Sequence, residues 1–192
     1  MDKVPQRSRE NEDLIDQALL RRVSEERDSH ALQTLYERFA PRVIGFLRRL
    51  TNDSGLIEEV YNDVMMTVWE KAHQYRSESK ASSWVFSIAY RRCLRLVKKQ
   101  NFRSGVLRML GQETNEPTSR GNAEVDESDL IEAALQRLSA PQRLVVELTY
   151  FRDFSTQEVA DIVDCPANTV KTRLFHARKQ IRTFVERQGV SA

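Results

Sequence analysis

The sequence predicts an all-α fold: two small helical domains joined by a flexible acidic linker, the second domain containing a helix-turn-helix. Three observations predict it. Apolar residues recur at the helical spacing of three or four through most of the chain, and strand-like alternation is scarce. Only six glycines occur among the 192 residues. One internal stretch, residues 101–127, breaks the helical pattern and gathers glycine, proline and acidic side chains.

The predicted domain boundaries follow from these composition changes. They give a polar tail at 1–12, a first helical domain at 13–100, the linker at 101–127 and a second helical domain at 128–188. Between Gln112 and Glu132 the only basic residue is Arg120, against seven acids. Such a composition is typical of a flexible connection between domains. From its charge alone, the linker could imitate nucleic acid inside a basic channel.

The C-terminal part of the chain predicts the helix-turn-helix. Ser155 and Glu158 fit a capping box, so a short helix should begin at Thr156. This helix should end near Asp164, because Pro166 disfavours helical geometry in the residue before it and suits the first turn of a new helix. The first helix should bury Val159, Ala160, Ile162 and Val163. The second should bury Val170, Leu174, Ala177, Ile181 and Val185.

The second helix of this unit is basic. Its only acid is Glu186, and its cations are Lys171, Arg173, Arg178, Lys179, Arg182 and Arg187. A basic second helix fits the major groove of DNA, where Arg and Lys meet phosphates and guanine edges. For a basic helix alone, a solvated face on a helical bundle would be the simpler interpretation. The capping box, the turn and the one-sided charge together favour DNA binding.

Composition excludes several other classes of protein. The chain is 40% hydrophobic and 30% charged with a net charge of +2, so it can bury cores and is not disordered throughout. No apolar run approaches the roughly 18 residues of a membrane span, and the N-terminus lacks the apolar core of a signal peptide. Cys93 and Cys165 are too few for a disulfide framework or a zinc site. We expect a soluble cytoplasmic protein without membrane insertion, metal or cofactor.

The first domain begins with two helical patterns. One starts near Leu14 and should end within the charged run 21–28. The next, residues 31–50, carries one apolar stripe and is either a single long helix or two helices joined at Pro41. The members of that stripe are Leu32, Leu35, Tyr36, Phe39, Val43, Phe46, Leu47 and Leu50. A turn follows, with Asp53 or Ser54 as the cap of a third helix.

The third helix, Leu56 to Ala72, has two different faces. Its inward residues are Leu56, Ile57, Val60, Tyr61, Val64, Met65, Val68 and Trp69. Its outward residues are Glu58, Glu59, Asn62, Asp63 and Met66. They form an acidic patch that a basic partner surface would recognise. The positive end of the helix dipole also explains acids near the start of a helix, and both explanations can hold.

A polar loop, residues 74–83, leads into a basic helix with aromatic residues. From Val85 to Arg103 there are six basic residues and no acid, and Trp84, Phe86 and Tyr90 lie among or beside them. Aromatic faces beside cations are what single-stranded nucleic acid needs for stacking and phosphate contacts. The alternative is that the aromatic and aliphatic residues form core and the cations are solvated, which we expect of Trp84 itself.

Four motifs in order make the chain similar to extracytoplasmic-function (ECF) sigma factors of bacterial RNA polymerase. They are LYERFAPRVIGFLRRLT, IEEVYNDVMMTVW, SSWVFSIAYRRCLR and LQRLSAPQRLVVELTYFRDFSTQEVADIVDCPANTVKTRLFHARKQIR. The resemblance covers about Leu14 to Arg187. It implies that the first domain binds the clamp helices of the polymerase core and melts the −10 element. The second domain would bind the −35 element and the polymerase flap, and the linker would thread toward the RNA exit channel. Promoter DNA and an anti-sigma factor are implied as further partners.

The resemblance also implies site residues. The core-binding set is Glu58, Glu59, Asn62 and Asp63. The −10 set, in the loop Tyr75 to Ser83 and the helix after it, is Tyr75, Arg76, Ser77, Ser79, Lys80, Tyr90, Arg91 and Arg95. The −35 set is Asn168, Thr169, Lys171, Thr172, Arg173 and His176. Arg91 and Arg95 stand where the family usually has Asn and Asp, and Asp164 and Asn168 where it often has Gly.

Two other functions compete with this one. A helix-turn-helix regulator acting without polymerase would more often carry a ligand pocket or a dimerisation surface, and neither is evident. A di-metal enzyme rests on Glu70 and His73, a single Glu-x-x-His match, whereas helical di-metal sites need two such motifs and further carboxylates. His30 and His176 have no acid three residues earlier. We therefore predict a protein that is not an enzyme.

Overall fold

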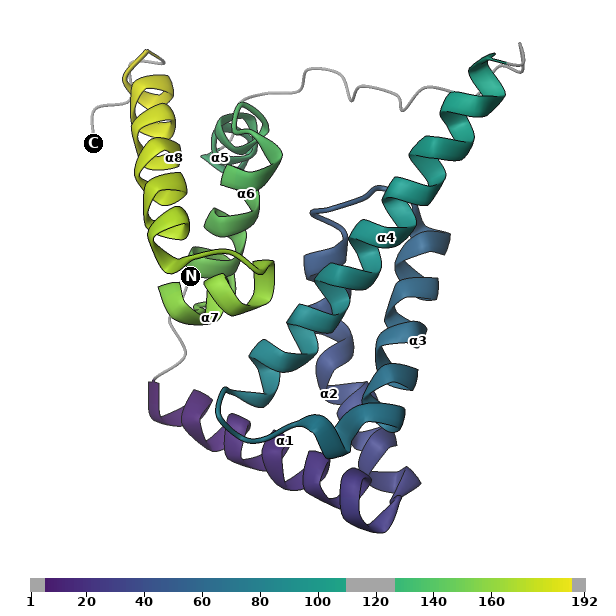
Figure 1. Ribbon diagram of the computed structural model, residues 1–192. Helices are drawn as coiled ribbons and strands as arrows, with labels where there is room; N and C mark the ends of the chain where they lie inside the picture. Colours follow the sequence, from purple (N-terminus) through teal and green to yellow (C-terminus); the bar gives the residue numbers. More distant parts are fainter. Residues whose placement is uncertain (1–5, 110–126, 188–192) are drawn as a thin grey trace. The chain divides into compact units, whose positions relative to one another are not determined.

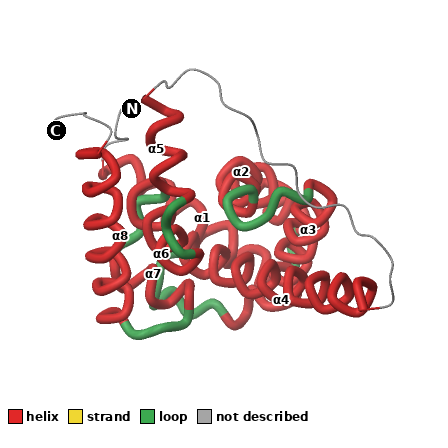
Figure 2. Tube along the Cα trace, turned by 90° about the horizontal axis from the view of Figure 1, so that it is seen from above, coloured by secondary structure: helices red, strands yellow, loops and turns green. Residues whose placement is uncertain are grey.

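The computed structural model describes the backbone of residues 6–109 and 127–187 and the side chains of residues 11–99 and 130–187. Within these ranges the chain forms eight α-helices and two short helical turns, with no strand (Figures 1 and 2). The predicted all-α fold is confirmed. Within the described ranges, no helix combines the length and the apolar character that a bilayer crossing requires.

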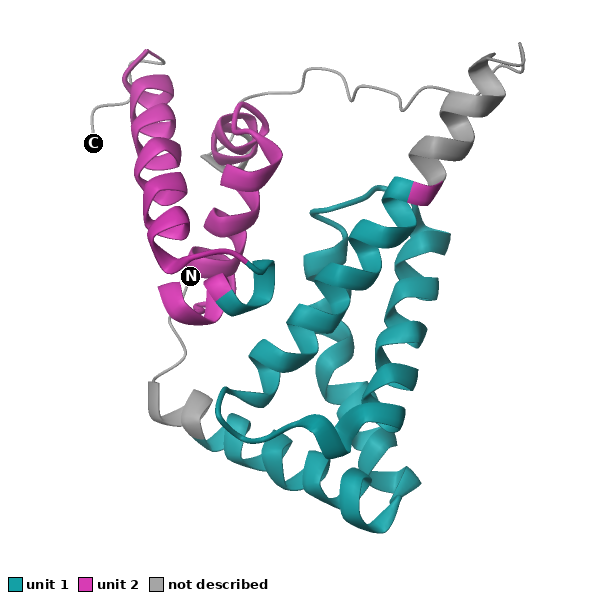
Figure 3. Ribbon diagram, in the orientation of Figure 1, with its two compact units in different colours: residues 1–98, 161–164 teal, residues 99–160, 165–192 magenta. Residues whose placement is uncertain are grey.

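The chain divides into two compact units, residues 1–98 with 161–164 and residues 99–160 with 165–192 (Figure 3). The short segment 161–164 takes the colour of the first unit in the figure. It is nevertheless the end of helix α7 and its turn, where the N–H of Cys165 donates to the carbonyl of Ala160. We therefore describe it with the helices of the second unit.

The first unit contains four long helices. They are α1 (Gln6–Glu26), α2 (Ser29–Leu47), α3 (Ser54–Lys71) and α4 (Ala81–Met109), with a 3₁₀ turn at Ala72–Gln74 between α3 and α4. Helix α1 packs on α2, on α3 and on the 3₁₀ turn. Large side chains with almost no exposure form the core: Leu20, Val23, Leu35, Phe39, Val43, Phe46, Val60, Tyr61 and Phe86. The rings of Phe46 and Phe86 lie 5.2 Å apart, which joins α2 to α4.

A buried carboxylate joins α1 to α2. Asp16 is 1% exposed, and its Oδ1 accepts a hydrogen bond of 2.7 Å from Nε of Arg38. Arg42 lies 3.9 Å from the other oxygen. Burial raises the pKa of the Asp16 carboxyl, and the two guanidinium groups oppose this. Polar pairing therefore fixes the register of the two helices beside their apolar contacts.

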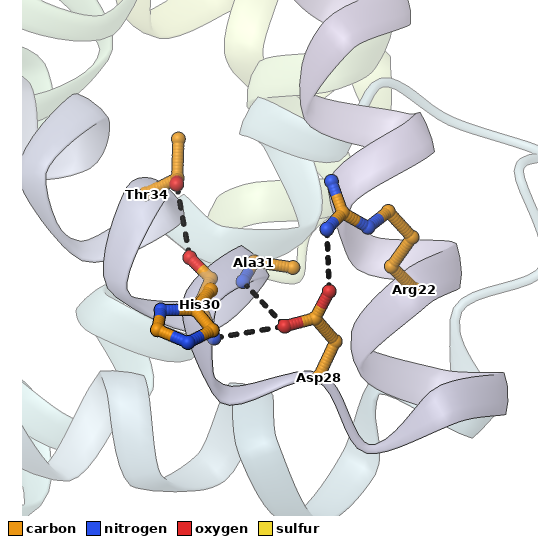
Figure 4. Close-up of polar contacts among 5 residues, drawn as sticks. All are labelled: Arg22, Asp28, His30, Ala31 and Thr34. Atoms are coloured by element: carbon orange, nitrogen blue, oxygen red, sulfur yellow. Dashed lines mark hydrogen bonds and ion pairs between the residues drawn. The ribbon is translucent and has the colours of Figure 1, made fainter.

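The start of α2 is capped by Asp28 (Figure 4). Its carboxylate accepts from the backbone N–H groups of His30 at 2.9 Å and Ala31 at 3.1 Å, and it pairs with Arg22 at 2.5 Å. The hydroxyl of Thr34 donates to the carbonyl of His30 one turn on. These hydrogen bonds, that of Ala31 foremost, lower the pKa of the Asp28 carboxyl. The cap explains why the chain turns within two residues between α1 and α2.

Several helix ends differ from the prediction. Helix α1 begins at Gln6 rather than near Leu14, and α4 begins at Ala81 rather than Trp84, because Ala81, Ser82 and Ser83 are buried. Helix α4 also continues to Met109, beyond the predicted start of the linker at residue 101. The rest of the predicted linker, 110–126, lies outside the described residues.

Proline does not break α2. Of the two possibilities left open by the sequence, the structure has a single helix with Pro41 inside it. Pro41 lies on the exposed face, and Phe39 and Val43 on either side of it are fully buried. Burial of this stripe offsets the loss of one backbone hydrogen bond. Of the two candidate caps for α3, Asp53 is the one used, accepting from the N–H of Leu56.

The second unit is built on α8. Its helices are α5 (Glu127–Gln136), α6 (Ala140–Val146), α7 (Thr156–Val163) and α8 (Ala167–Arg187), with a π-helical turn at Glu147–Phe151 after α6. Helix α8 packs on α5 and α6. The core holds Leu135, Leu138, Leu144, Val145, Leu148, Ile162, Val170, Leu174, Ala177 and Phe184. Phe184 was not predicted, and the predicted Ile181 and Val185 are only half-buried.

The predicted helix-turn-helix is present in its details. The carboxylate of Glu158 accepts from the N–H of Ser155 at 2.7 Å, and the Ser155 hydroxyl accepts from the N–H of Glu158 at 3.3 Å. Helix α7 begins at Thr156 as predicted, and its four predicted core residues are all buried. In the turn, Asp164 has a φ of 54°, in the left-handed region that favours glycine. Glycine adopts this left-handed geometry without strain, which explains why the family often has glycine where this chain has Asp164.

We expect Asp164→Gly to stabilise the protein. Glycine removes the left-handed penalty of about 1–2 kcal/mol, against a chain-entropy cost of about 0.5–1 kcal/mol, so the free energy of unfolding should rise by roughly 0.5–1 kcal/mol. Urea unfolding followed by circular dichroism measures it. The matched control is Asp161→Gly in helical geometry three residues earlier, which should lower stability by about 1 kcal/mol. Equal effects at both positions would contradict the prediction.

Candidate nucleic-acid interface

Helix α8 presents most of the predicted −35 residues to solvent. Asn168, Lys171, Thr172 and His176 are exposed, while Thr169 is half-buried. The carbonyl of Pro166 accepts from the N–H groups of Thr169 and Val170, which opens the helix directly after the turn. The Thr172 hydroxyl donates to the carbonyl of Asn168 at 2.9 Å and so is directed along the helix. The exposed set lies on the N-terminal half of α8, where a recognition helix meets base edges.

Arg173 is less free than the sequence indicated. Its side chain is half-buried, and Nη1 lies 3.8 Å from Sγ of Cys165 in the turn. The guanidinium therefore leans toward the turn, beside Thr169, rather than projecting from the fully exposed face. Arg178 is also engaged, because its Nε donates to the Tyr150 hydroxyl at 2.5 Å. Lys171, Lys179 and Arg182 on this helix are exposed, as Arg178 is.

One aromatic residue on this helix was missed. Phe175 is 64% exposed, three residues after Thr172 and seven after Asn168, and hence on the side of the predicted reading residues. Its ring meets that of His176 edge-on at 5.5 Å. The signal in the sequence was its spacing of three from Thr172 and seven from Asn168, which puts it on the same face of the helix as these predicted −35 residues. An exposed aromatic there can contact a thymine methyl group.

The acidic patch of α3 is assembled as predicted. Glu58, Glu59 and Asn62 are exposed, and Met66 beside them is 56% exposed. The Tyr36 hydroxyl donates to Oδ1 of Asn62 at 3.3 Å, so α2 contributes to the same surface. Tyr36 was assigned to the core stripe of α2, and this was wrong: it is 41% exposed, lying against Tyr61 at a ring distance of 4.8 Å.

Asp63 differs from the other acids of the patch. Its carboxylate lies 3.5 Å from Nη1 of Arg92 on α4, and Nη2 of the same guanidinium donates to the Thr67 hydroxyl at 3.0 Å. Thr67 in turn donates to the carbonyl of Asp63. Arg92, one of the six basic residues between Val85 and Arg103, is therefore tied to α3. This network connects the acidic face of α3 with the basic helix α4.

The loop between α3 and α4 is a short, ordered turn. It runs from Tyr75 to Lys80, because Ala81 already belongs to α4. The Tyr75 hydroxyl donates to the carbonyl of Ser79 at 2.6 Å, and its ring lies 5.6 Å from that of Trp84. Ser77 has a φ of 58°, in the left-handed region. Arg76, Ser77 and Lys80 are exposed, whereas Ser79 is half-buried.

Helix α4 divides cleanly into a buried and a basic side. Val85, Phe86, Ala89 and Cys93 are buried, and burial raises the pKa of the Cys93 thiol to about 11. Arg91 and Arg95 are exposed, and Tyr90 and Trp84 are half-buried. Nη2 of Arg91 donates to the Ser87 hydroxyl at 2.7 Å, which holds this cation along the helix. The arrangement offers cations beside an aromatic edge, as strand binding requires.

The enzyme alternative gains nothing from the structure. Glu70 and His73 are both exposed. Among the residues described, no three His, Cys, Asp or Glu side chains gather in a way that could hold a metal ion.

Comparison with known proteins gives a family match in each of the two units. The family model of Sigma-70 region 2 matches residues 35–103, and that of Sigma-70, region 4, matches residues 128–181. The ECF RNA polymerase sigma factor RpoE of Cereibacter sphaeroides is 32% identical over 176 residues, covering 86% of this chain and 92% of that protein. This chain belongs to the ECF sigma factor family. SigK of Mycolicibacterium vanbaalenii is 30% identical over 170 residues, covering 86% of each chain.

Solved structures agree with the fold of an ECF sigma factor. CnrH, in complex with the cytosolic domain of CnrY, has a TM-score of 0.64 at 16% identity, over 90% of this chain and 97% of CnrH. RpoE of Bartonella quintana, in complex with the anti-sigma factor NepR, has a TM-score of 0.63 at 22% identity, over 80% and 96%. The chain is therefore an RNA polymerase sigma factor, a DNA-binding initiation factor of transcription.

Proposed function

We propose that the two units of this sigma factor divide promoter recognition between them. The first unit binds the polymerase core through α3 and takes up the melted −10 strand with the loop Tyr75–Lys80 and α4. The second unit reads the −35 duplex with α8. The observation that carries the proposal is the separation of faces on α4 and α8, where one side is buried in a core and the other presents cations and aromatic residues.

Promoter opening by this protein requires no covalent chemistry. Binding energy from strand contacts offsets the unpairing of bases, and stacking in a protein pocket replaces stacking in the duplex. We therefore propose a cytoplasmic, non-enzymatic factor, active only together with core polymerase. The alternative, a helix-turn-helix regulator that is not a polymerase subunit, would act on DNA without the polymerase core. Transcription reconstituted with and without core distinguishes the two.

An anti-sigma factor is proposed as a further partner. Two proteins of similar fold were solved in complexes: CnrH with the cytosolic domain of CnrY, and the sigma factor RpoE of Bartonella quintana with the anti-sigma factor NepR. An inhibitor that covers α3 or α8 would block core binding or DNA binding, since these faces carry the exposed functional residues. A signal that removes the inhibitor would then release the factor.

Core docking is tested by charge reversal on α3. Glu59 and Asp63 lie four residues apart on one face, so the double change to Lys should abolish co-purification with core polymerase and transcription. Because Asp63 also pairs with Arg92, circular dichroism must show that the variant is folded. The control is the double change of Glu25 and Glu26 to Lys, which makes the same change of charge at two exposed positions of α1. Wild-type yield of the complex with the double variant would place docking elsewhere.

Reading of the −35 element is tested at Arg173. Its change to Ala should weaken binding to −35 duplex by about 1–3 kcal/mol and relax preference at one base pair, as loss of a bidentate contact does. Lys171→Ala should instead weaken all sequences alike and lower the salt dependence, as loss of a phosphate contact does. Fluorescence anisotropy of labelled −35 duplexes at several salt concentrations distinguishes the base contact from the phosphate contact. Unchanged affinity and preference for Arg173→Ala would reject its assignment.

The loop is tested by removing its polar groups. Arg76, Ser79 and Lys80 are changed to Ala, and Ser77 to Gly, because its φ of 58° makes Ala unsuitable. The variant should keep core assembly and −35 binding but fail to open a closed promoter, and a pre-melted −10 bubble should rescue it only partly. A fluorescent base analogue in the −10 strand reports opening. Opening at the wild-type rate and extent would make the loop a mere connector.

A further inference from the structure

The π-helical turn after α6 places a tyrosine beside α8. Helix α6 packs on α8, and Leu148 in the turn and Phe154 just after it are buried. The N–H of Arg152 donates to the carbonyl of Glu147 across the turn, and the side chains of the same two residues pair at 3.1 Å. Between these fixed points Tyr150 is 49% exposed. Turns of this wide kind are frequent at functional sites.

Tyr150 holds the guanidinium group of Arg178. Nε of Arg178 donates to the phenolic oxygen at 2.5 Å, and the guanidinium carbon lies 5.7 Å from the centre of the ring. Because the phenolic oxygen accepts this bond, its own hydrogen remains available to another acceptor. The two Nη groups of Arg178 have no hydrogen-bond or ion-pair partner among residues 11–99 and 130–187. The pair therefore presents donors from two side chains at one place.

The positive charge of Arg178 is not neutralised by the described part of the second unit. Arg152 pairs with the carboxylate of Glu147, and Arg182 pairs with that of Glu186. Arg178 has only the neutral phenol as its partner there. A cation that is held in place without a counter-ion, beside a second donor, suits an anion with several oxygen atoms.

The position of Arg178 along α8 indicates which anion it meets. Lys171 and Phe175 precede it by seven and three residues, so all three lie on one side of the helix, and all three are exposed. At a rise of 1.5 Å per residue, Arg178 lies about 10 Å further along the helix than Lys171. A recognition helix places its N-terminal residues at the base edges of a major groove that is about 12 Å wide. Arg178 then lies at the rim of the groove, where the phosphates are.

We propose that Tyr150 and Arg178 together bind one backbone phosphate of the duplex that flanks the −35 element. The inference rests on the proposed reading of this element by α8. The two Nη groups of Arg178 meet two oxygens of the phosphate, the paired arrangement that makes arginine–phosphate contacts strong and directional. The phenol donates to the same phosphate and keeps the guanidinium pointed at the strand. Such a contact fixes the register of the protein on the duplex and carries no sequence information.

The test uses holoenzyme reconstituted with core polymerase and a labelled promoter duplex. Fluorescence anisotropy at several salt concentrations gives the affinity and its salt dependence. Loss of one phosphate contact reduces the slope of log K against log salt by about 0.9, which corresponds to about 8-fold weaker binding at about 0.1 M salt. Arg178→Gln should show both changes and keep the wild-type base preference within the −35 element.

The decisive variant is Tyr150→Phe, which keeps the ring and removes only the hydroxyl. It should weaken binding by about 2- to 10-fold, as loss of one hydrogen bond does, with unchanged base preference. Combined with Arg178→Gln, it should add no further loss, because both changes disrupt the same contact. Both positions are exposed, and thermal unfolding by circular dichroism confirms that the variants are folded.

The matched control is Arg137→Gln. Arg137 is another exposed arginine of the second unit, and its guanidinium lies over the ring of Phe184 at 4.4 Å. Its loss removes the same charge from a cation that also rests on an aromatic ring. The affinity and the salt dependence of this control should equal those of the wild type.

A neutral methylphosphonate, placed at single positions in and beside the −35 element, locates the phosphate. At one flanking position this replacement should weaken binding by the wild type about 8-fold and binding by Arg178→Gln about twofold or less. The position should be the same whatever bases surround it, since the contact is to the backbone alone.

The outcomes separate this inference from the function on which it rests. If no phosphate position distinguishes Arg178→Gln from the wild type while Arg173→Ala still alters base preference, −35 reading by α8 stands and the phosphate site is overturned. If Arg178→Gln loses affinity and Tyr150→Phe binds as the wild type does, the shared site is overturned. An equal loss in Arg137→Gln would also overturn it, since net charge would then explain the effect. If scrambling the −35 sequence leaves the affinity unchanged, −35 reading fails and the inference fails with it.

Discussion

Burial of one side of α4 is the constraint on which the first unit depends. Phe86, at 0% exposure, meets Phe46 of α2, and Cys93, about two helical turns further along on the same side, is 1% exposed. With that side fixed, the helical period leaves Arg91 and Arg95 on the solvent side. The same apolar contacts that stabilise the fold therefore set the direction of the cations. A basic track on a helix without such a core would have no fixed orientation toward a nucleic-acid strand.

The contact between α3 and α4 joins the acidic face of one helix to the basic helix beside it. Asp63, Thr67 and Arg92 form a network in which the two charged groups are each about one-third to one-half exposed, at 34% for Arg92 and 45% for Asp63. A pair this exposed contributes little to stability, on the order of 0–1 kcal/mol. Its consequence is geometric: Arg92 is directed toward Asp63 and Thr67 of α3. A partner that neutralises Asp63 would change the surroundings of Arg92 as well.

Sequence patterns were most informative where structure is local. The capping box at Ser155, the stop before Pro166 and the buried stripe of α7 follow from hydrogen bonds and periodicity within a few residues, and all are present. Patterns were less informative where residues distant in the sequence decide whether a side chain is buried. Tyr36 has the spacing of a core residue, yet Tyr61 packs against it from α3 and leaves it at the surface. No periodicity in α2 encodes that neighbour.

The sequence by itself determined the all-α class, the helix-turn-helix, the acidic face of α3 and the basic face of α4, because each depends on the order of residues within one helix. Only the tertiary structure decided which of the polar side chains on these faces already have a hydrogen-bond or ion-pair partner within the protein. Arg92 on α4 pairs with Asp63 of α3, and Arg178 on α8 donates a hydrogen bond to the hydroxyl of Tyr150. These contacts join segments far apart in the chain. Their geometry depends on how whole helices pack, which local spacing does not specify.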